Sequence, residues 1–443
     1  EAHNNLGLTL QDLGQLEVAV KRYEKALAIK PDYADAYANR GDVLKDLERL
    51  DEAIASYESA IALNPELGFI LGDIYFTKMS LCIWDDLENH LNQLTKKINN
   101  NIKVLKPFPM LVMIDDPEIQ KKTAEIYINE LFPQSHVLPK IERYPKHNKI
   151  RIGYFSPDFR NHAVAYLIAE LFEIHDKNRF EIYAFSYGLD TKDEMNLRIK
   201  VGVDYFHDVR TMSDIDVVML ARSVELDIAV DLGGFTQNSR TGIFAMSAAP
   251  IQISYIGYLG TMGANYYDYL VADQTIIPEK NQKYYSEKIA YLPSYQVNDS
   301  TQSLPETIFT RQDVGLPEAG FVFCCFNNTY KITPTTFDSW GRILDQVDGS
   351  VLIIYVNNES AKTNLTKEIV LRGIDPSRLI FGERLPKPEY LARYRVADLF
   401  LDTLPYNAGT TASDALRMGL PVLTCIGNSF ACRMAASVIN AVN

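Results

Sequence analysis

The sequence predicts a region of α-helical repeats followed by two α/β domains with doubly wound parallel sheets. Three observations support this fold class. Six positions near the amino end recur 34 residues later. Short apolar segments then alternate with helical patterns in two series, one between residues 151 and 273 and one between residues 321 and 427. Strands that are apolar on both faces and separated by helices are typical of parallel sheets covered on both sides.

The repeat is the clearest pattern. The repeated residues are Gly7, Leu10, Ala19, Tyr23, Ala26 and Pro31, which return as Gly41, Leu44, Ala53, Tyr57, Ala60 and Pro65. This period and these residue types are the tetratricopeptide signature. We expect Tyr23 and Tyr57 to fill the space between neighbouring helix pairs, and each proline to end a second helix. Residues 1–66 then hold two repeats of an array that continues upstream, because at least three repeats are normally needed for stability.

A helical linker region is predicted for residues 67–148. Its apolar residues Leu87, Leu91, Leu94 and Ile98 lie at helical spacing. Asp116 and Pro117 have the residue types of a helix start. Prolines at 133, 139 and 145 then indicate a polar tether before the first α/β domain.

The first α/β domain is predicted for residues 149–305 and the second for residues 306–443, incomplete at its carboxyl end. Strands are expected at residues 151–155, 180–186, 227–232 and 267–273, and at 321–326, 351–356, 378–383, 397–403 and 421–427. The segment 298–318 joins the two domains. In such folds the ligand binds outside the carboxyl ends of the strands.

Length and composition exclude several classes of protein. The 443 residues predict two to four domains. The 44 Lys and Arg against 57 Asp and Glu give a net charge of −13, which argues against a nucleic-acid or membrane partner. Five cysteines without CxxC spacing suit a reducing compartment. No secretory leader is visible, so we expect a cytoplasmic protein.

One segment tests this interpretation, because residues 241–267 carry no charge and are long enough to span a bilayer. The segment is rich in glycine and contains Pro250, amide and hydroxyl side chains, which a spanning helix disfavours. We therefore expect a buried loop and strand there.

The common nucleotide and hydrolase motifs are absent from the sequence. Gly257, Gly260 and Gly263 form a GxxGxxG spacing, for which tight turns are the simplest explanation. Asp214 and Asp216 superficially offer a metal site. They lie in an amphipathic helix that Ser213 can cap, so we expect no metal there.

His162 is the candidate histidine. It follows the first strand and precedes an apolar helical pattern. Asn161 is a good N-cap, which would place His162 in the first helical turn at the ligand edge of the sheet. There the helix dipole favours a neutral imidazole that accepts a proton or a hydrogen bond. A surface histidine at a helix start is the alternative.

The second domain offers a phosphate site. Asn328, Tyr330 and Lys331 follow its first strand, and a lysine there could neutralise phosphate. Gly409, Thr410 and Thr411 precede a helix that contains Asp414. Free backbone N–H groups at such a helix start suit a diphosphate. Capping by Thr410 or Thr411 is an alternative that can hold at the same time.

Four ordered segments resemble a known family. They are RIGYFSPDFRNHAVAYLI, PIQISYIGYLGTMGANYYDYLVAD, FVFCCFNNTYKITPTTFDSW and DTLPYNAGTTASDALRMGLPVLT. They resemble the catalytic segments of the O-linked N-acetylglucosamine (O-GlcNAc) transferases, glycosyltransferase family 41, in which tetratricopeptide repeats precede a GT-B pair of Rossmann-like domains. The short segment 298–318 is similar to bacterial members, because animal enzymes carry a large insert there.

The resemblance implies an inverting enzyme that transfers N-acetylglucosamine from UDP-GlcNAc to Ser or Thr hydroxyls of proteins, without a metal or other cofactor. The repeats would select the acceptor proteins. His162 would position the reactants, and the proton acceptor is either His162 or the donor phosphate. Lys331 would stabilise the leaving diphosphate, and the remaining implied contacts are Thr410 and Thr411 to phosphate, Asp414 to ribose, Lys387 and Arg393 beside uridine, and Gly257 near the sugar.

Several residues depart from the animal pattern. Asn328 replaces Gln, Tyr390 replaces a His near uracil, and Gly409 replaces a His by the phosphates. Leu259 and Ala163 stand where Pro is common. These departures leave open another sugar donor or acceptor, or a scaffold that binds nucleotide without turnover. The final strand and closing helix of a GT-B domain are expected beyond Asn443.

Overall fold

The computed structural model describes residues 1–142 and 144–442. The chain divides into two compact units, and each is made of two segments that are far apart in sequence. The first unit comprises Glu1–Met113 and Thr310–Leu385. The second unit comprises Ile114–Phe309 and Pro386–Asn443. Each unit is described by itself below.

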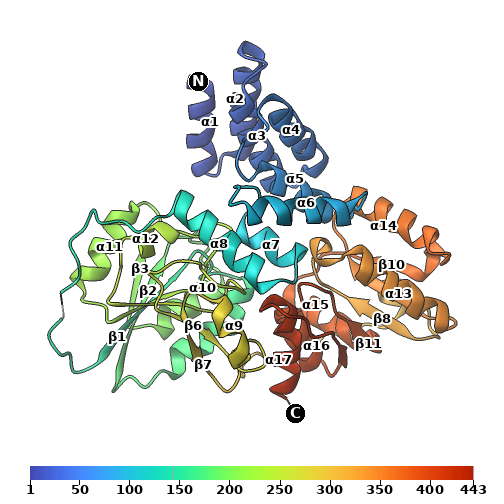
Figure 1. Cartoon of the computed structure of the whole chain (residues 1–443). Helices are drawn as coiled ribbons and strands as arrows, with labels where there is room; N and C mark the ends of the chain where they lie inside the picture. Colours follow the sequence, from blue (N-terminus) through green and yellow to red (C-terminus); the bar gives the residue numbers. More distant parts are fainter. Residues whose placement is uncertain (143, 443) are drawn as a thin grey trace. The chain divides into compact units, whose positions relative to one another are not determined.

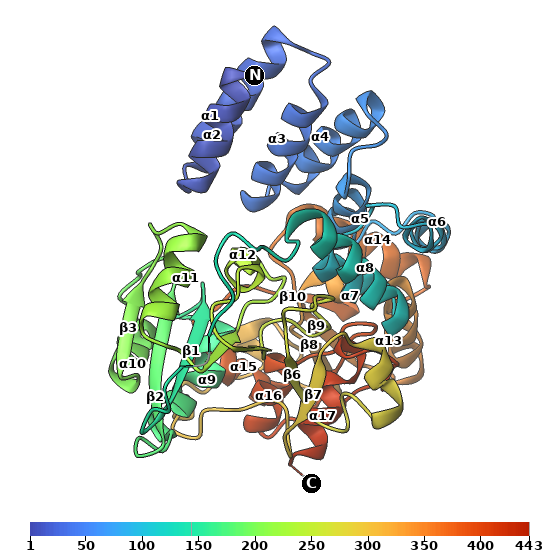
Figure 2. The same cartoon turned by 60° about the vertical axis from the view of Figure 1, so that its left-hand side comes forward.

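The first unit begins with two helical hairpins (Figures 1 and 2). Their helices are α1 (Ala2–Asp12), α2 (Leu16–Ile29), α3 (Ala34–Asp46) and α4 (Leu50–Leu63). The two predicted repeats are confirmed, and so is the role of the prolines, because α2 and α4 each end two residues before Pro31 or Pro65.

The tyrosines of the repeats pack differently from the prediction. Each ring lies against the glycine of its own hairpin: a Cβ atom on Gly7 would lie 2.5 Å from Tyr23 Cε1, and one on Gly41 would lie 2.5 Å from Tyr57 Cε1. Both rings are fully buried. Because each glycine has no Cβ atom, there is space for the ring inside the hairpin. The rings therefore pack within their own hairpins as well as toward neighbouring helix pairs.

Three further helices follow in the first unit, namely α5 (Ile70–Ser80), α6 (Leu87–Asn99) and α7 (Pro107–Met113). Ile70 and Ile74 of α5 belong to the same apolar cluster as Tyr57 of the second repeat. The helical prediction for this region is therefore confirmed, and α5 extends the core of the repeats.

The remaining part of the first unit is a parallel β-sheet segment with flanking helices. Its elements are β8 (Val322–Cys325), α13 (Pro334–Gln346), β9 (Val351–Tyr355), α14 (Glu359–Leu371) and β10 (Leu379–Gly382), with short 3₁₀ helices η2 (Gln312–Val314), η3 (Thr329–Lys331) and η4 (Pro376–Arg378). Strand β9 pairs in parallel with β8 and with β10.

The second unit contains a seven-stranded parallel sheet in the order β3-β2-β1-β4-β5-β6-β7. Its strands are β1 (Ile150–Ser156), β2 (Phe180–Ser186), β3 (Tyr205–Asp208), β4 (Ile228–Asp231), β5 (Ile251–Ser254), β6 (Tyr269–Ala272) and β7 (Lys288–Tyr291). The accompanying helices are α8 (Pro117–Leu131), α9 (Ala163–Ile174), α10 (Glu194–Gly202), α11 (Asp214–Ser223), α12 (Thr241–Ala245) and η1 (Glu279–Tyr284).

The sequence predictions for this part of the chain are mostly confirmed. Asp116 caps α8, as its residue type suggests, by accepting from the amides of Glu118 and Ile119. The uncharged segment 241–267 forms α12, β5 and a loop. Throughout the described ranges, no helix has the length and apolar character needed to cross a membrane.

The second unit also contains the last elements of the chain. These are α15 (Lys387–Arg393), η5 (Tyr394–Val396), β11 (Leu399–Leu401), α16 (Thr410–Arg417), β12 (Val422–Leu423), η6 (Ala431–Arg433) and α17 (Met434–Asn440). Strands β11 and β12 pair in parallel. The prediction of helical repeats followed by two parallel-sheet domains is confirmed.

Candidate functional site

His162 lies in the loop that follows the carboxyl end of strand β1, where it caps α9 itself. Its backbone is extended, and its Nδ1 atom accepts from the amide of Val164 at 3.3 Å. The prediction that Asn161 caps this helix is wrong. The side chain of Asn161 instead accepts from the amide of Met195 at 3.3 Å, next to the start of α10. His162 therefore precedes the first turn of α9.

The imidazole of His162 is held neutral mainly by burial. Burial lowers the pKa of His162 below 6.5, Arg160 lowers it further, and Asp158 opposes both. The Asp158 carboxylate lies 3.5 Å from Nδ1. Because Nδ1 accepts the Val164 amide, the hydrogen-bond network assigns the proton of the neutral ring to Nε2. His162 thus offers an N–H donor on the side away from its helix.

Lys387, the first residue of α15, and Asp414, in the middle of α16, form a close pair. Lys387 Nζ lies 3.0 Å from Oδ1 and 2.9 Å from Oδ2 of Asp414. Burial raises the pKa of Asp414, and the charge of Lys387 opposes that rise. The same ammonium lies 5.2 Å from the ring centre of Tyr166 and 5.3 Å from that of Tyr390. Because Tyr166 follows His162 on α9, Lys387 connects α9 with α16.

The first turn of α16 keeps the character of an anion site. Gly409, which has no side chain, is its N-cap residue. Thr410 and Thr411, the alternative caps, are the first two residues of the helix itself. The amides of Ala412 and Ser413 both donate to the carbonyl of Gly409 at 3.1 Å. Backbone amides and the positive end of the helix dipole at such a start favour phosphate.

Gln296 and Tyr394 support this helix start, and sequence reasoning missed both. Gln296 is buried, and its side-chain amide donates to Ser413 Oγ. Tyr394 donates from its hydroxyl to the carbonyl of Thr411 at 3.3 Å.

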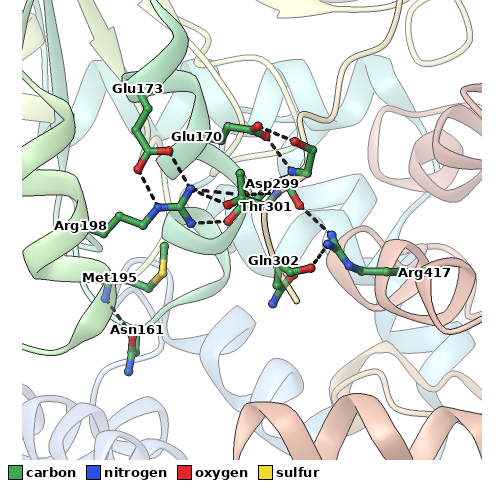
Figure 3. Close-up of polar contacts among 10 residues, drawn as sticks. Asn161, Glu170, Glu173, Met195, Arg198, Asp299, Thr301, Gln302 and Arg417 are labelled. Atoms are coloured by element: carbon green, nitrogen blue, oxygen red, sulfur yellow. Dashed lines mark hydrogen bonds and ion pairs between the residues drawn. The ribbon is translucent and has the colours of Figure 1, made fainter. Parts of the chain in front are cut away.

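A connecting segment fixes the two helices that carry these residues (Figure 3). Arg198 of α10 donates to Glu173 of α9 at 2.8 Å and also to the Asp299 carboxylate. Arg417, the last residue of α16, donates to the carbonyl of Asp299 at 2.7 Å and to that of Gln302. We call the side chains of Glu173, Arg198 and Arg417 with the segment 299–302 the connector clamp. It links the far ends of α9 and α16.

The loop after β5 is rich in glycine because its backbone packs closely against neighbouring segments. A Cβ atom on Gly257 would lie 1.9 Å from the carbonyl oxygen of Leu232, so no other residue fits there. Gly263 has a φ of +65°, as a tight turn requires. Ile256 has a φ of 63°, which is strained for a β-branched residue. The buried carboxylate of Glu287 holds the loop by accepting from Thr261 Oγ1 at 2.7 Å.

Three predicted site residues belong to the first unit, in and next to η3. The Asn328 side chain donates to the Tyr330 hydroxyl at 3.0 Å. The Tyr330 ring packs 5.3 Å from that of Phe76, which gives it a structural role in the helical region. Lys331 ends η3 and is half-buried.

The remaining predicted residues are Arg393 and the two aspartates, Asp214 and Asp216, at which no metal was expected. Arg393 is buried, with its guanidinium 5.8 Å from the Tyr390 ring centre. Ser213 caps α11 as expected, and Asp214 pairs with Arg240 at 2.6 Å. Over residues 1–142 and 144–442, no group of three or more His, Cys, Asp or Glu side chains could hold a metal ion.

Comparisons with known proteins agree with this architecture. The family model of glycosyl transferase family 41 matches residues 119–308 and 300–443, and tetratricopeptide repeat models match residues 7–47 and 34–67. The structure of a mutant O-GlcNAc transferase from Thermobaculum terrenum superposes with a TM-score of 0.80 and 25% sequence identity, over 99% of this chain and 84% of that chain.

Two curated relatives carry the name UDP-N-acetylglucosamine–peptide N-acetylglucosaminyltransferase. The Arabidopsis thaliana protein, named as a probable enzyme of this kind (SEC), is 33% identical over 384 residues, which is 82% of this chain. The Caenorhabditis elegans protein is 25% identical over 491 aligned residues. The chain spans 39% and 42% of the lengths of these two relatives. With both α/β regions matched by the family model, the chain belongs to glycosyl transferase family 41.

Proposed function

We propose that this protein transfers N-acetylglucosamine from UDP-GlcNAc to serine or threonine hydroxyls of proteins. One observation carries the proposal: the amino end of α16 lies beside the Lys387–Asp414 pair, within a chain that belongs to family 41. The relatives' names supply the donor and the peptide acceptor. The repeats in α1–α4 would select the acceptor proteins.

The donor diphosphate is assigned to the first turn of α16. The amides of Thr410 and Thr411 suit its charge. Asp414 suits a ribose hydroxyl, because its carboxylate is held in place by Lys387 and accepts hydrogen bonds. Lys387, Tyr390 and Arg393 are assigned to the uridine, and Gly257 to the sugar. Asn328 and Tyr330 of the first unit are assigned to donor binding only through the sequence match.

The chemical step is an in-line displacement with inversion. The acceptor oxygen forms a bond to the anomeric carbon while the bond from that carbon to the UDP oxygen breaks, and UDP leaves with the electron pair. Lys331 is assigned to the negative charge that develops on UDP. Because positive charge comes from Lys331 and backbone amides, we propose that no metal ion is needed, and turnover should persist in EDTA.

His162 is assigned a positioning role. Its Nε2–H would donate to the substrate, because Nδ1 is engaged with the Val164 amide. The proton of the acceptor hydroxyl then passes to a phosphate oxygen of the donor. The sequence leaves two candidate proton acceptors, His162 and the donor phosphate, and we assign the proton to the donor phosphate.

The direct test is turnover by the protein with UDP-GlcNAc and acceptor proteins from the same cell, followed by intact-mass measurement. We expect modified proteins that gain one N-acetylhexosamine on serine or threonine, and release of UDP. UDP binding without any modified protein would contradict transfer and would support the nucleotide-binding scaffold.

A different sugar donor is the second candidate. Tyr390 and Gly409 occupy positions where animal members have histidines, and Gln296 Oε1 lies 3.4 Å from where a Cβ atom on Gly409 would be. The surroundings of the diphosphate therefore differ in shape and charge from the animal pattern. A panel of nucleotide sugars, each assayed with the same acceptors, distinguishes the donors, and we expect UDP-GlcNAc to give the highest kcat/KM.

A further inference from the structure

The 3₁₀ helix η3 rests on the carboxyl end of α5, within the first unit. Thr329 Oγ1 donates to the carbonyl of Ser80, the last residue of α5, at 2.7 Å. The last four carbonyls of an α-helix have no partner within the helix. The hydroxyl of Thr329 satisfies one of them, so a side chain beside Lys331 caps a helix of the amino-terminal region.

Aromatic packing adds a second attachment at the same place. The Tyr330 ring lies 5.3 Å from that of Phe76 on α5 and 6.2 Å from that of Phe108 on α7. The rings of Phe76 and Phe108 are in edge contact with each other at 6.2 Å. Such pairs contribute beyond the area that they bury. Consecutive residues of η3 are thus fixed by a hydrogen bond and by a ring cluster.

The turn after α5 is also held by a residue of α14. Asn364 donates from its side chain to the carbonyl of Leu81 at 2.8 Å. Leu81 is fully buried. The surface on which Thr329 rests is therefore itself fixed by two elements.

Helix α5 also belongs to the core of the repeats. Ile70 and Ile74 in its first half are part of the apolar cluster that contains Tyr57 and Ala53 of the second repeat. One helix therefore contacts the repeats with its first half and η3 with its carboxyl end. Packed side chains transmit displacements because protein interiors are dense.

We propose that Thr329 is a positioning residue for Lys331, and that the carboxyl end of α5 sets the direction in which the lysine leaves the backbone. This inference rests on the proposed role of Lys331 in UDP departure. Lys331 donates its amide to Asn328 at 3.0 Å, and Ile332 donates to Thr329 at 2.9 Å. The turn that carries Lys331 is therefore closed directly around Thr329. A misplacement of about 1 Å can cost about 10²-fold in rate.

The test compares three variants of the complete protein. Thr329→Val removes the hydroxyl and keeps the shape, whereas Thr329→Ser restores the hydroxyl. Thr366→Val is the matched control, because Thr366 is also half-buried in the first unit and its hydroxyl donates to a carbonyl, that of Lys362, at 2.8 Å. The measurements are kcat and KM for UDP-GlcNAc, the melting temperature, and amide hydrogen exchange of residues 328–332.

For Thr329→Val we expect a loss of about 10- to 100-fold in kcat with little change in KM, and faster exchange of residues 328–332. Thr329→Ser should recover most of the rate. Thr366→Val should lower the melting temperature to a similar extent and leave kcat unchanged. Equal kcat values for the two valine variants, or no recovery with serine, would overturn the proposal.

Failure of the proposed function has a different signature. If the wild-type protein transfers no sugar, the function is contradicted, while hydrogen exchange still reports whether Thr329 orders η3. Unchanged exchange in Thr329→Val overturns the positioning role whether or not sugar is transferred.

Discussion

The ammonium group of Lys331 is assigned to the UDP that leaves during transfer. Loss of one such group typically costs about 10²–10³ in turnover. We expect Lys331→Ala to reduce kcat to that extent and to leave the melting temperature almost unchanged. Lys362→Ala, which removes a surface lysine paired with Glu359 in the same unit, is the control. Full turnover by Lys331→Ala would refute the assignment.

His162 gives an expectation for pH. Burial lowers the pKa of its imidazole below 6.5, so the unfolded chain binds a proton more readily than the folded one. Its contribution to stability is therefore present above about pH 6.5 and is lost as the pH falls. Protonation would also remove the acceptor for the Val164 amide.

We expect the acid limb of kcat/KM to lie below pH 6.5, and His162→Gln to remove that limb. Thermal unfolding and initial rates between pH 5 and 8 measure both effects. His136→Gln, at an exposed site before the first sheet, should leave the profile as in the wild type. An acid limb that His162→Gln retains would mean that another group controls it.

Asp414 is the residue on which recognition of ribose depends in the proposal. A hydrogen bond to a charged group contributes about 1.5–3 kcal/mol. We therefore expect Asp414→Asn to raise the Kd of UDP by about 10- to 100-fold in calorimetry. Glu194→Gln, an exposed carboxylate at the start of α10, is the control and should bind UDP normally. Equal affinity in the two variants would remove Asp414 from the site.

Among the elements, α16 depends on the connector clamp. Burial alone would raise the pKa of Asp299, but the hydrogen bonds from Arg198 and Thr301 outweigh it and hold the pKa below 3.8. The Asp299 side chain is only 4% exposed. Its ionised form therefore stabilises the fold above the unfolded pKa, and this contribution is lost as the pH falls through the folded pKa.

We expect Asp299→Asn to cost about 1–3 kcal/mol at neutral pH and to weaken UDP binding through α16. The difference from the wild type in denaturant unfolding should shrink below pH 3.8. Asp208→Asn breaks the exposed pair with Arg210, and we expect it to cost under about 1 kcal/mol. If the two variants lose equal stability, the clamp contributes no more than a surface pair.

The repeat helices depend on glycine at one position of each hairpin. A methyl group on Gly41 would meet the Tyr57 ring at 2.5 Å, and overpacking of this kind costs about 1–3 kcal/mol. We expect Gly41→Ala to lower the melting temperature. Gly68→Ala is the control, because its nearest neighbour would lie at 3.5 Å. An unchanged melting temperature in Gly41→Ala would show that the hairpin can open to admit the methyl group.

Elements were predictable where their signal is local. Strands β8 and β9 are continuous apolar runs. In contrast, β3 and β7 have four residues each, with half-exposed or exposed side chains, and their sequences contain no apolar run. The helix after β1 was predicted, but its cap was not, because the amide of Met195 competes for Asn161 from a distant segment. Thr329, Gln296 and the connector clamp act through partners far along the chain, which no periodicity records.

The whole molecule is divided in a way that does not follow the order of the chain. Residues 310–385 form one compact unit with the helical repeats. We expect Ile74→Ala, which cuts into the core shared by α5 and the repeats at a cost of about 2–5 kcal/mol, to speed hydrogen exchange in β8, β9 and β10. Exchange in β1–β7 should change less.

Val218→Ala in α11 of the second unit is the matched core substitution, since Val218 is fully buried. We expect Val218→Ala to have the opposite effect on hydrogen exchange, which should speed up more in the seven-stranded sheet than in β8–β10. The same distribution for both variants would mean that the whole chain opens as a single cooperative body.

The cap on α5 has a consequence for biosynthesis. Ser80 and Thr329 are 249 residues apart. At about 5–20 residues per second, a ribosome adds Thr329 about 12–50 s after Ser80. All seven strands β1–β7 are synthesised in that interval. A nascent chain therefore carries its repeats and all the strands of its first sheet well before Thr329 can cap α5 and fix the turn that holds Lys331.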